Sequence, residues 1–318
     1  MNARNELYKL SVIIPTYNRA DILSKCLGAL SRQNYLFNGF EVIVSDDGSS
    51  DHTAELVSTV TSAAPFSLIY LRQSNKSANA ARNRAIEISR GEILLFLNDD
   101  TIAEPDMLSE HIRTHEEYQD DHIAVLGRMT ISPDVPRSIF ATQHLDAAFN
   151  LLKNKTSLDW RAFYTCNISV KRTFLLNYGL FDEKLRYHDD VELGERLSHH
   201  GLVIHYNPKA LGHHYHYLSV RDYLQLAQHD GKQLAIWYRR SPHLRRELTS
   251  AGIYTNLPFP KRLRCIIGDL VVNQFTIPGI LRTACFMTSR NQQIALFLYK
   301  RVYQSLRRKA IRDELFKT

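Results

Sequence analysis

Among the places where the sequence sets carboxylates side by side, three stand where they could do chemistry. They are Asp46-Asp47, Asn98-Asp99-Asp100 and Asp189-Asp190. Adjacent carboxylates raise each other's pKa, and a divalent cation removes that cost. Mg²⁺ and Mn²⁺ commonly bind one or two carboxylates together with substrate phosphates. Each motif also has a structural alternative. Asp46-Asp47 could form an Asx turn before Gly48, Asn98-Asp99-Asp100 a capped turn, and Asp189-Asp190 the acidic start of a helix.

Short continuous apolar runs identify the elements that must position these motifs. Runs of this kind are typical of strands covered on both faces, and their spacing of about 25 to 30 residues matches βαβ units. Asp21, Asp51 and Ser77 are the expected N-caps of the intervening helices. The expected strands are residues 12–14, 42–44, 68–71 and 93–97.

The first two acidic motifs follow expected strands, so four carboxylates should meet at one rim of the sheet. In an open parallel sheet, ligands bind beyond the carboxyl ends of the strands. The sequence contains neither GxGxxG nor GxxxxGK[ST], which argues against a dinucleotide-binding enzyme and a P-loop NTPase.

Further along the chain, we expect a helix that starts at Pro105 and a second helix over 190–200 that Gly201 closes. Strands are expected over 123–126, 163–170 and 203–206. From residue 221 the pattern becomes helical and rich in Arg. The predicted organisation is thus a domain of residues 1–220 and a mainly helical region of residues 221–318.

Composition excludes several classes of protein. With 44% hydrophobic and 23% charged residues and 4 Cys, the chain is neither disordered nor a disulfide scaffold. The separated cysteines fit a reducing cytoplasm. Residues 221–318 carry 18 Lys or Arg against 6 Asp or Glu, which predicts an anionic partner for this region. The longest mostly apolar run there, 270–281, is too short for the roughly 20 residues of a membrane span.

Three segments together resemble the family 2 glycosyltransferases, in the family's order. They read LSVIIPTYNRADILSKCLGALSRQ with EVIVSDDGSSDHT, ANAARNRAIEISRGEILLFLNDDT, and TCNISVKRTFLLNYGLFDEKLRYHDDVELGERL ending in HHYH. The resemblance covers roughly the first 220 residues. It implies an α/β fold of the GT-A type, with a mostly parallel, Rossmann-like sheet flanked by helices. It also implies a nucleotide-sugar donor, a divalent metal and an inverting transfer.

The resemblance assigns roles to the residues that hold the donor. Asp47 corresponds to the carboxylate that bonds the base edge, and such a carboxylate suits uracil or guanine alike. Asp46 is left to form the Asx turn. The alternative for Arg82 is a solvated helix face. The residues expected to bind the nucleotide sugar are Pro15, Thr16, Tyr17, Asp47, Arg82, Asn83, Asn98 and Asp99.

The resemblance also assigns the metal site and the base. Asp100 corresponds to the metal ligand and Asp99 to the ribose contact, while Asn98 departs from the acidic version of the motif. His214, with His216 second, corresponds to a histidine that completes the metal site. Asp190 corresponds to the general base and Asp189 to a residue that orients the acceptor. Cys166-Asn167 resembles a step that lines the acceptor pocket.

The leading hypothesis is a Mg²⁺- or Mn²⁺-dependent inverting transferase in glycan synthesis. It would move a sugar from a nucleoside diphosphate sugar, with UDP favoured, to a hydroxyl of a glycan or lipid-linked acceptor. The expected location is the cytoplasm, with the basic region on an anionic membrane surface. A sugar-nucleotide nucleotidyltransferase and a nucleic-acid-binding protein are the alternatives. The sequence contains no recognisable nucleic-acid-binding motif, so we expect no nucleic-acid partner.

Overall fold

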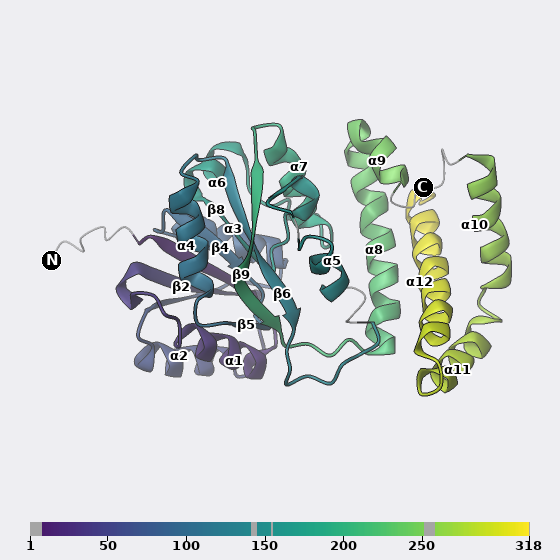
Figure 1. The fold of residues 1–318 in the computed structure, drawn as a ribbon, viewed down its shortest axis with the longest axis horizontal. Coiled ribbons are helices and arrows are strands. Elements are labelled where there is room, and N and C mark those ends of the chain that lie inside the picture. The colour runs from purple at the N-terminus through teal and green to yellow at the C-terminus, as the bar shows by residue number, and fades with distance from the viewer. Residues whose placement is uncertain (1–7, 141–144, 154, 251–257, 318) are drawn as a thin grey trace. The chain divides into compact units, whose positions relative to one another are not determined.

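The structure, a computed structural model, describes residues 8–140, 145–153, 155–250 and 258–317. Two compact units emerge: Met1–Arg137 with Thr142–Tyr217, and Ser138–Ala141 with Leu218–Thr318. Figure 1 shows their elements as a ribbon. The assignment of residues 1–220 as catalytic and 221–318 as a basic accessory region stays a prediction.

The first unit is built on a mixed sheet with the order β3-β2-β1-β4-β8-β6-β9-β5, and β7 pairs with β9. The strands β3, β2, β1 and β4 are parallel to one another, whereas β8 runs antiparallel to both β4 and β6. The bounds of the strands are β1 Leu10–Thr16, β2 Phe40–Asp46, β3 Ser67–Arg72, β4 Ile93–Leu97, β5 Thr101–Ala103, β6 Ile123–Ile131, β7 Ser157–Leu158, β8 Asn167–Lys171 and β9 Val203–His214.

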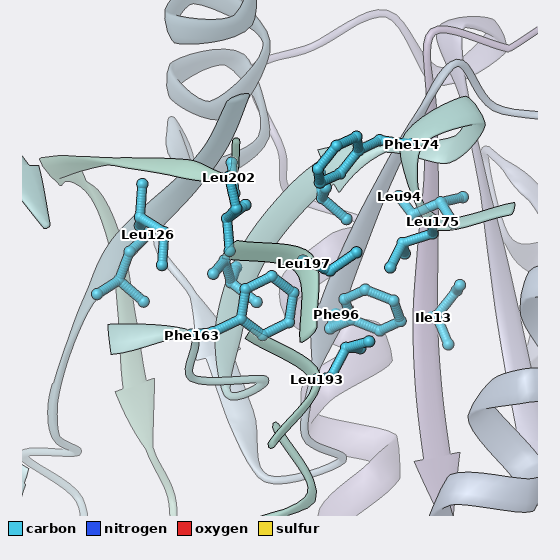
Figure 2. Packing of buried hydrophobic residues seen from close by; sticks show 14 of the residues in the cluster. Ile13, Leu94, Phe96, Leu126, Phe163, Phe174, Leu175, Leu193, Leu197 and Leu202 are labelled. Atoms are coloured by element: carbon cyan, nitrogen blue, oxygen red, sulfur yellow. The ribbon is translucent and has the colours of Figure 1, made fainter. Parts of the chain in front are cut away.

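Helices cover both faces of this sheet, as expected for an α/β fold. The helices of the first unit are α1 Ala20–Leu30, α2 Thr53–Ala63, α3 Ala78–Ile88, α4 Met107–Glu117, α5 Ala147–Asn150, α6 Arg172–Tyr178 and α7 Asp189–Ser198. Strand side chains alternate between the faces. Ile13 and Phe96 pack in the same core as side chains of α3, α6 and α7, whereas Val12 and Ile14 pack with those of α1, α2 and α4. Figure 2 shows the first of these cores.

Several local expectations are confirmed. The four N-terminal strands form where predicted, and Ser77 caps α3 by accepting the Ala80 amide at 3.1 Å. Gly201, which lies beyond α7, has a φ of 88°, a left-handed conformation that suits glycine. Helices α8 to α12 occupy the described part of the C-terminal region.

Other local expectations are wrong. Strand β3 is half-buried because it lies at the end of the strand order. The N-cap of α1 is Arg19, so Asp21 lies in its first turn, and the N-cap of α2 is His52 rather than Asp51. Pro105 precedes the N-cap of α4, which is Asp106.

The described residues of the C-terminal unit form helices joined by turns and short connections. Its helices are α8 Val220–Arg240, α9 Arg245–Ser250, α10 Phe259–Val271, α11 Ile277–Thr288 and α12 Gln292–Leu315. A capping box of Ser219 and Asp222 starts α8. Asp230 of α8 pairs with Arg307 of α12. Among the described residues, no helix has both the length and the apolar character that crossing a membrane requires.

Candidate active site

The site lies between β1 and β4, where the strand order reverses direction. From β1 the chain builds the sheet outward through β2 to β3, and it then returns to place β4 on the other side of β1. Such a reversal leaves a crevice at the carboxyl ends of the two central strands. Thr16, at the end of β1, donates a hydrogen bond of 2.8 Å from its hydroxyl to Asp99, which follows β4. The two strand ends are thus joined at the crevice.

A cavity of about 300 Å³ occupies this crevice. Most of the residues expected to bind the nucleotide sugar line it, with Asn83 as the exception, and Arg19 and Ala78 are additional. The lining residues are Pro15, Thr16, Tyr17, Arg19, Asp47, Ala78, Arg82, Asn98 and Asp99. The cavity therefore combines an exposed aromatic ring, Tyr17, with two buried acids and two guanidinium groups.

The two acids at the end of β2 have different partners. Asp46 is buried and accepts hydrogen bonds from the amide and hydroxyl of Ser49, at 2.8 and 2.6 Å, so it closes the turn, although over three residues rather than the two of an Asx turn. Asp47 lines the cavity, and its Oδ1 atom accepts bonds from Gln73 and from the Lys76 amide, at 2.7 and 2.8 Å. These two bonds fix the Asp47 carboxylate against the wall of the cavity.

Asp99 and Asp100 are buried, and a single arginine bridges them. Arg19 donates to Asp99 Oδ1 and to Asp100 Oδ2, both at 2.8 Å. His214 Nε2 lies 3.2 Å from Asp100 Oδ2, because the register of β5 with β9 places Thr101 opposite His214. Burial and the neighbouring Asp100 charge raise the pKa of Asp99 to about 6 against the effect of Arg19. For Asp100, the bonds to His214 and Arg19 outweigh burial and hold its pKa well below the usual range.

The residues around Asp100 fit a divalent cation. The Oδ1 atom of Asp100 is buried and has no hydrogen-bond partner among the described residues. A buried carboxylate oxygen without a partner is costly, and a cation would supply one. A carboxylate and an imidazole are also ligands that Mn²⁺ and related cations accept. Asp100 and His214 could therefore hold the cation, as expected from the sequence.

Arg82 connects the cavity with the acidic pair Asp189-Asp190. Its side chain is buried, and one terminal nitrogen donates to Asn79 at 2.9 Å and to Asp189 at 3.1 Å. The alternative of a solvated helix face is therefore wrong. Asn83 instead bonds the backbone of Phe181 through both ends of its amide, so it positions this segment and does not line the cavity.

Asp190 is held at the start of α7 by backbone amides. Its Oδ1 atom accepts the Val191 amide at 2.8 Å, and its Oδ2 atom accepts the Thr165 amide at 3.4 Å. Burial and the neighbouring Asp189 charge raise the pKa of Asp190 to about 6. A carboxylate with such a pKa is ionised near neutral pH and binds a proton more readily than an ordinary aspartate, which suits a general base.

A short connection links Asp190 to Asp100, which could hold the cation together with His214. The hydroxyl of Thr101, the residue after Asp100, donates to the carbonyl of Cys166 at 3.3 Å. Thr165, the residue before Cys166, donates its amide to Asp190. Burial raises the pKa of the Cys166 thiol to about 12, and the charges of Asp190 and Asp100 add to this shift. Cys166 therefore lies near both carboxylates.

The expected strand over 163–170 begins late, and this decides where Asp190 is held. The chain turns before β8, with the Asn167 amide donating to the Tyr164 carbonyl at 3.4 Å. The Thr165 amide is thus turned toward Asp190 instead of pairing in the sheet. Asn167 is fully buried and bonds His111 and the Ala210 carbonyl, both at 2.8 Å, so it is a structural residue and not part of an acceptor pocket.

Arg19 is the charged residue of the cavity that the sequence pattern did not identify. It starts α1 directly after the strand-end motif Pro15-Thr16-Tyr17-Asn18, so its place beside the rim was available as a signal. Three other histidines of this region, which were expected to be packing or surface residues, have contacts of that kind. His213 bonds Thr130 and Glu104, His205 stacks on Tyr118, and His200 stacks on Tyr178.

Comparison with known protein families identifies this architecture. The family model described as Glycosyl transferase family 2 matches residues 11–179, which is more than half of the chain. The chain belongs to this family. The matched segment of this family 2 protein contains the cavity, Asp47, Asp99 and Asp100, whereas Asp190 and His214 lie beyond it.

Individual relatives agree with the assignment. The uncharacterized glycosyltransferase YfnE of Bacillus subtilis is 32% identical over 246 residues, which cover 61% of this chain and 62% of YfnE. The mannosyltransferase PcManGT of Pyrobaculum calidifontis, solved with GDP-Man and Mn²⁺, has a TM-score of 0.67 at 18% identity, covering 97% of this chain and 87% of its own. S. aureus TarS 1-349 with UDP has a TM-score of 0.57 at 18% identity, covering 96% and 91%.

The solved structures and the sequence relatives support different conclusions about this chain. The two solved structures share the fold, so the expected GT-A-type α/β architecture with a helical C-terminal region is confirmed. The chain spans less than two thirds of the length of curated relatives such as YfnE. The family assignment favours glycosyl transfer over the nucleotidyltransferase and nucleic-acid alternatives.

Proposed function

We propose that the protein is a metal-dependent inverting glycosyltransferase. It transfers a sugar from a nucleoside diphosphate sugar, with UDP favoured, to a hydroxyl of a glycan or lipid-linked acceptor. The observation that carries this proposal is the connection between two acidic sites. Arg82 lines the donor cavity and pairs with Asp189, while Thr101 and Cys166 link Asp100 with the segment that holds Asp190.

The cavity offers each part of a nucleotide donor a fitting partner. Asp47 can accept an N–H of a uracil or guanine edge, and the ring of Tyr17 can pack against the base. Asp99 can accept a ribose hydroxyl bond. The solved relatives PcManGT and TarS, with GDP-Man and UDP respectively, provide precedent for such donors on this fold.

The chemistry requires one proton transfer. The acceptor hydroxyl attacks the anomeric carbon, the bond from that carbon to the diphosphate breaks, and Asp190 takes the hydroxyl proton. Asp189, held by Arg82, orients the acceptor beside Asp190. Asp100 and His214 would hold Mg²⁺ or Mn²⁺, which when bound neutralises the charge of the leaving diphosphate.

A panel of nucleotide sugars tests the proposed function directly. The purified protein is incubated with UDP- and GDP-sugars and Mn²⁺, with and without candidate glycan and lipid-linked acceptors. We expect release of the nucleoside diphosphate to depend on one donor and to increase with a suitable acceptor. Absence of binding to every nucleoside diphosphate would rule the proposal out.

The C-terminal unit supports a peripheral contact with an anionic membrane, as the sequence predicts. Helix α10 and the segment after it expose large apolar side chains: Phe259 is 74% exposed, Leu270 is 71% exposed and Phe275 is 83% exposed. Lys261, Arg262 and Arg264 are exposed on the same helix. A basic helix with an exposed apolar face suits the interface of an anionic bilayer.

Other basic residues of this unit have internal partners. Arg307 pairs with Asp230, and Arg308 pairs with Asp269 of α10 at 2.5 Å. These two arginines are therefore engaged within the unit and do not contribute to the proposed membrane contact. Some of the apolar residues also pack internally, because Ala284 and Ala295 join a core with Tyr299. The proposed membrane contact is thus confined to α10 and the segment that follows it.

Co-sedimentation with vesicles tests this contact. At low salt we expect the protein to sediment with phosphatidylcholine vesicles that contain phosphatidylglycerol and not with phosphatidylcholine alone. Leu270→Asp combined with Phe275→Asp should lower the bound fraction about tenfold or more, because each large apolar side chain contributes about 1.5 kcal/mol or more when buried. Leu151→Asp, at a position that is 78% exposed in the first unit, is the matched control. Equal recovery with both kinds of vesicle would contradict the proposal.

A further inference from the structure

Arg19 combines a fixed backbone with a side chain that bonds both Asp99 and Asp100. Its carbonyl accepts the Ile22 and Leu23 amides at the start of α1. Asn18 before it has a φ of 53° and accepts the Ser50 amide at 2.7 Å. The Ala20 amide donates to Asp51 at 3.1 Å. The main chain on both sides of Arg19 is therefore tied to neighbouring loops, which leaves its side chain as the part that can move.

The guanidinium group of Arg19 lies at the boundary between the buried acids and solvent. The side chain of Arg19 is 33% exposed, whereas those of Asp99 and Asp100 are each 5% exposed. Its two terminal nitrogens bond one carboxylate each, so a single positive charge offsets two adjacent negative charges. Long arginine side chains with planar, forked donors bind phosphate groups in the same bidentate way.

We propose that Arg19 is an exchangeable counter-ion that couples cation binding to donor binding. In the structure Arg19 bonds Asp99 and Asp100; when a diphosphate enters the cavity that Arg19 also lines, the guanidinium group bonds the diphosphate instead. This inference rests on the proposed function, since the diphosphate belongs to the donor. It gives Arg19 the role of coupling the two ligands, which Asp100 and His214 do not provide when they only hold the cation.

The electrostatic argument gives the sign of the coupling. With Arg19 in place, a cation meets an acid pair whose formal charge is reduced from −2 to −1, so a cation alone binds weakly. With a diphosphate present, Arg19 has another anionic partner, and the acid pair regains its full charge for the cation. Each ligand therefore strengthens the binding of the other by the same factor.

A purely structural role predicts the opposite response to substitution. If Arg19 only braced the two carboxylates, its removal would disorder the acid pair and weaken cation binding. If it acts as an exchangeable counter-ion, its removal exposes the full charge of the pair and strengthens the binding of a cation alone. Arg19→Gln and Arg19→Lys separate these two cases, because Lys keeps the charge without the forked pair of donors.

The experiment measures binding rather than turnover. Calorimetric titrations give the affinity for Mn²⁺ alone, for UDP alone and for UDP with saturating Mn²⁺, with GDP as the second nucleotide. We expect Arg19→Gln to bind Mn²⁺ alone about tenfold more tightly than the unmodified protein. The factor by which Mn²⁺ strengthens UDP binding should fall about tenfold, within the usual range of coupling between two sites. Arg19→Lys should lie between the two.

Controls keep the failure of this inference distinct from the failure of the proposed function. Arg32→Gln, at an exposed arginine that follows the same helix, should leave each affinity unchanged. Thermal unfolding checks that the variants are folded. Unchanged or weaker Mn²⁺ binding by Arg19→Gln, in a protein that binds UDP or GDP, would overturn the role of Arg19. If the unmodified protein binds neither nucleotide, the proposed function fails and this inference fails with it.

Discussion

Replacing Asp190 by Asn is expected to lower turnover by a factor of about 10² to 10⁴, with donor binding nearly unchanged. The amide preserves the size of the side chain, and its oxygen can still accept the Val191 or Thr165 amide. It cannot accept a proton from the acceptor hydroxyl at neutral pH. Steady-state rates and donor affinity, measured on the same preparation, separate the two effects.

Asp189→Asn is the matched comparison, because it alters the neighbouring carboxylate of the same pair. It weakens the ion pair with Arg82 but leaves Asp190 as a base, so a smaller loss of turnover is expected. Wild-type turnover in Asp190→Asn together with a complete loss in Asp189→Asn would show that the roles within the pair are reversed.

The pH profile of the unmodified enzyme provides a second check on Asp190. A base must be ionised to act, so the rate should rise with pH, be half-maximal near the Asp190 pKa of about 6, and level off at higher pH once Asp190 has lost its proton. Burial and the Asp189 charge raise this pKa, and Arg82 and the backbone amides of Val191 and Thr165 oppose the shift. Tyr164 and Cys166 lie near enough for the Asp190 charge to raise their own pKa values. A profile without an acidic limb would contradict the assignment.

Replacing Asp100 by Ala is expected to remove the metal dependence of donor binding and to lower turnover by about 10² or more, an effect comparable to the loss of a major electrostatic contact in an active site. Asp100 contributes a buried oxygen without a hydrogen-bond partner among the described residues, beside His214. The residual affinity for UDP should be insensitive to a chelator. Titrations of UDP with Mn²⁺ and with EDTA measure this difference.

Two further variants make the Asp100 result specific. Asp121→Ala, at an exposed acid of the same unit, should leave donor binding unchanged. His214→Ala should reduce the effect of Mn²⁺ only in part, because Asp100 remains. Activity of the unmodified protein that resists a chelator would show that Asp99 and Asp100 do not hold an essential cation.

Local pattern was sufficient for the four N-terminal strands and for the rim that they form. Strands such as β1 and β4 are recognisable because their apolar runs are buried on both faces, and burial depends on residue type at each position. The acids at their ends follow directly in the chain. The resemblance to a family then indicated which carboxylates to consider, and residues 11–179 match that family.

Local pattern was misleading where backbone direction, not hydrophobicity, decides the structure. The segment over 163–166 is apolar enough for a strand, yet it turns so that the Thr165 amide reaches Asp190. Asn83 and Asn167 follow family-like motifs, yet their amides bond buried backbone carbonyls. Sequence pattern reports which side chains are apolar, but it does not report which backbone groups lack partners.

Composition and periodicity were enough to predict the alternation of strands and helices in the first unit, the acid pairs and the basic character of the C-terminal region. Which distant residues meet depends instead on the folded arrangement of the chain. Arg82 pairs with Asp189 across 107 positions of the chain, and Arg19 bridges Asp99 and Asp100 across about 80. His214 reaches Asp100 because β9 pairs with β5. These contacts depend on sheet order and register, which arise from packing between distant segments, whereas composition and periodicity report local preference.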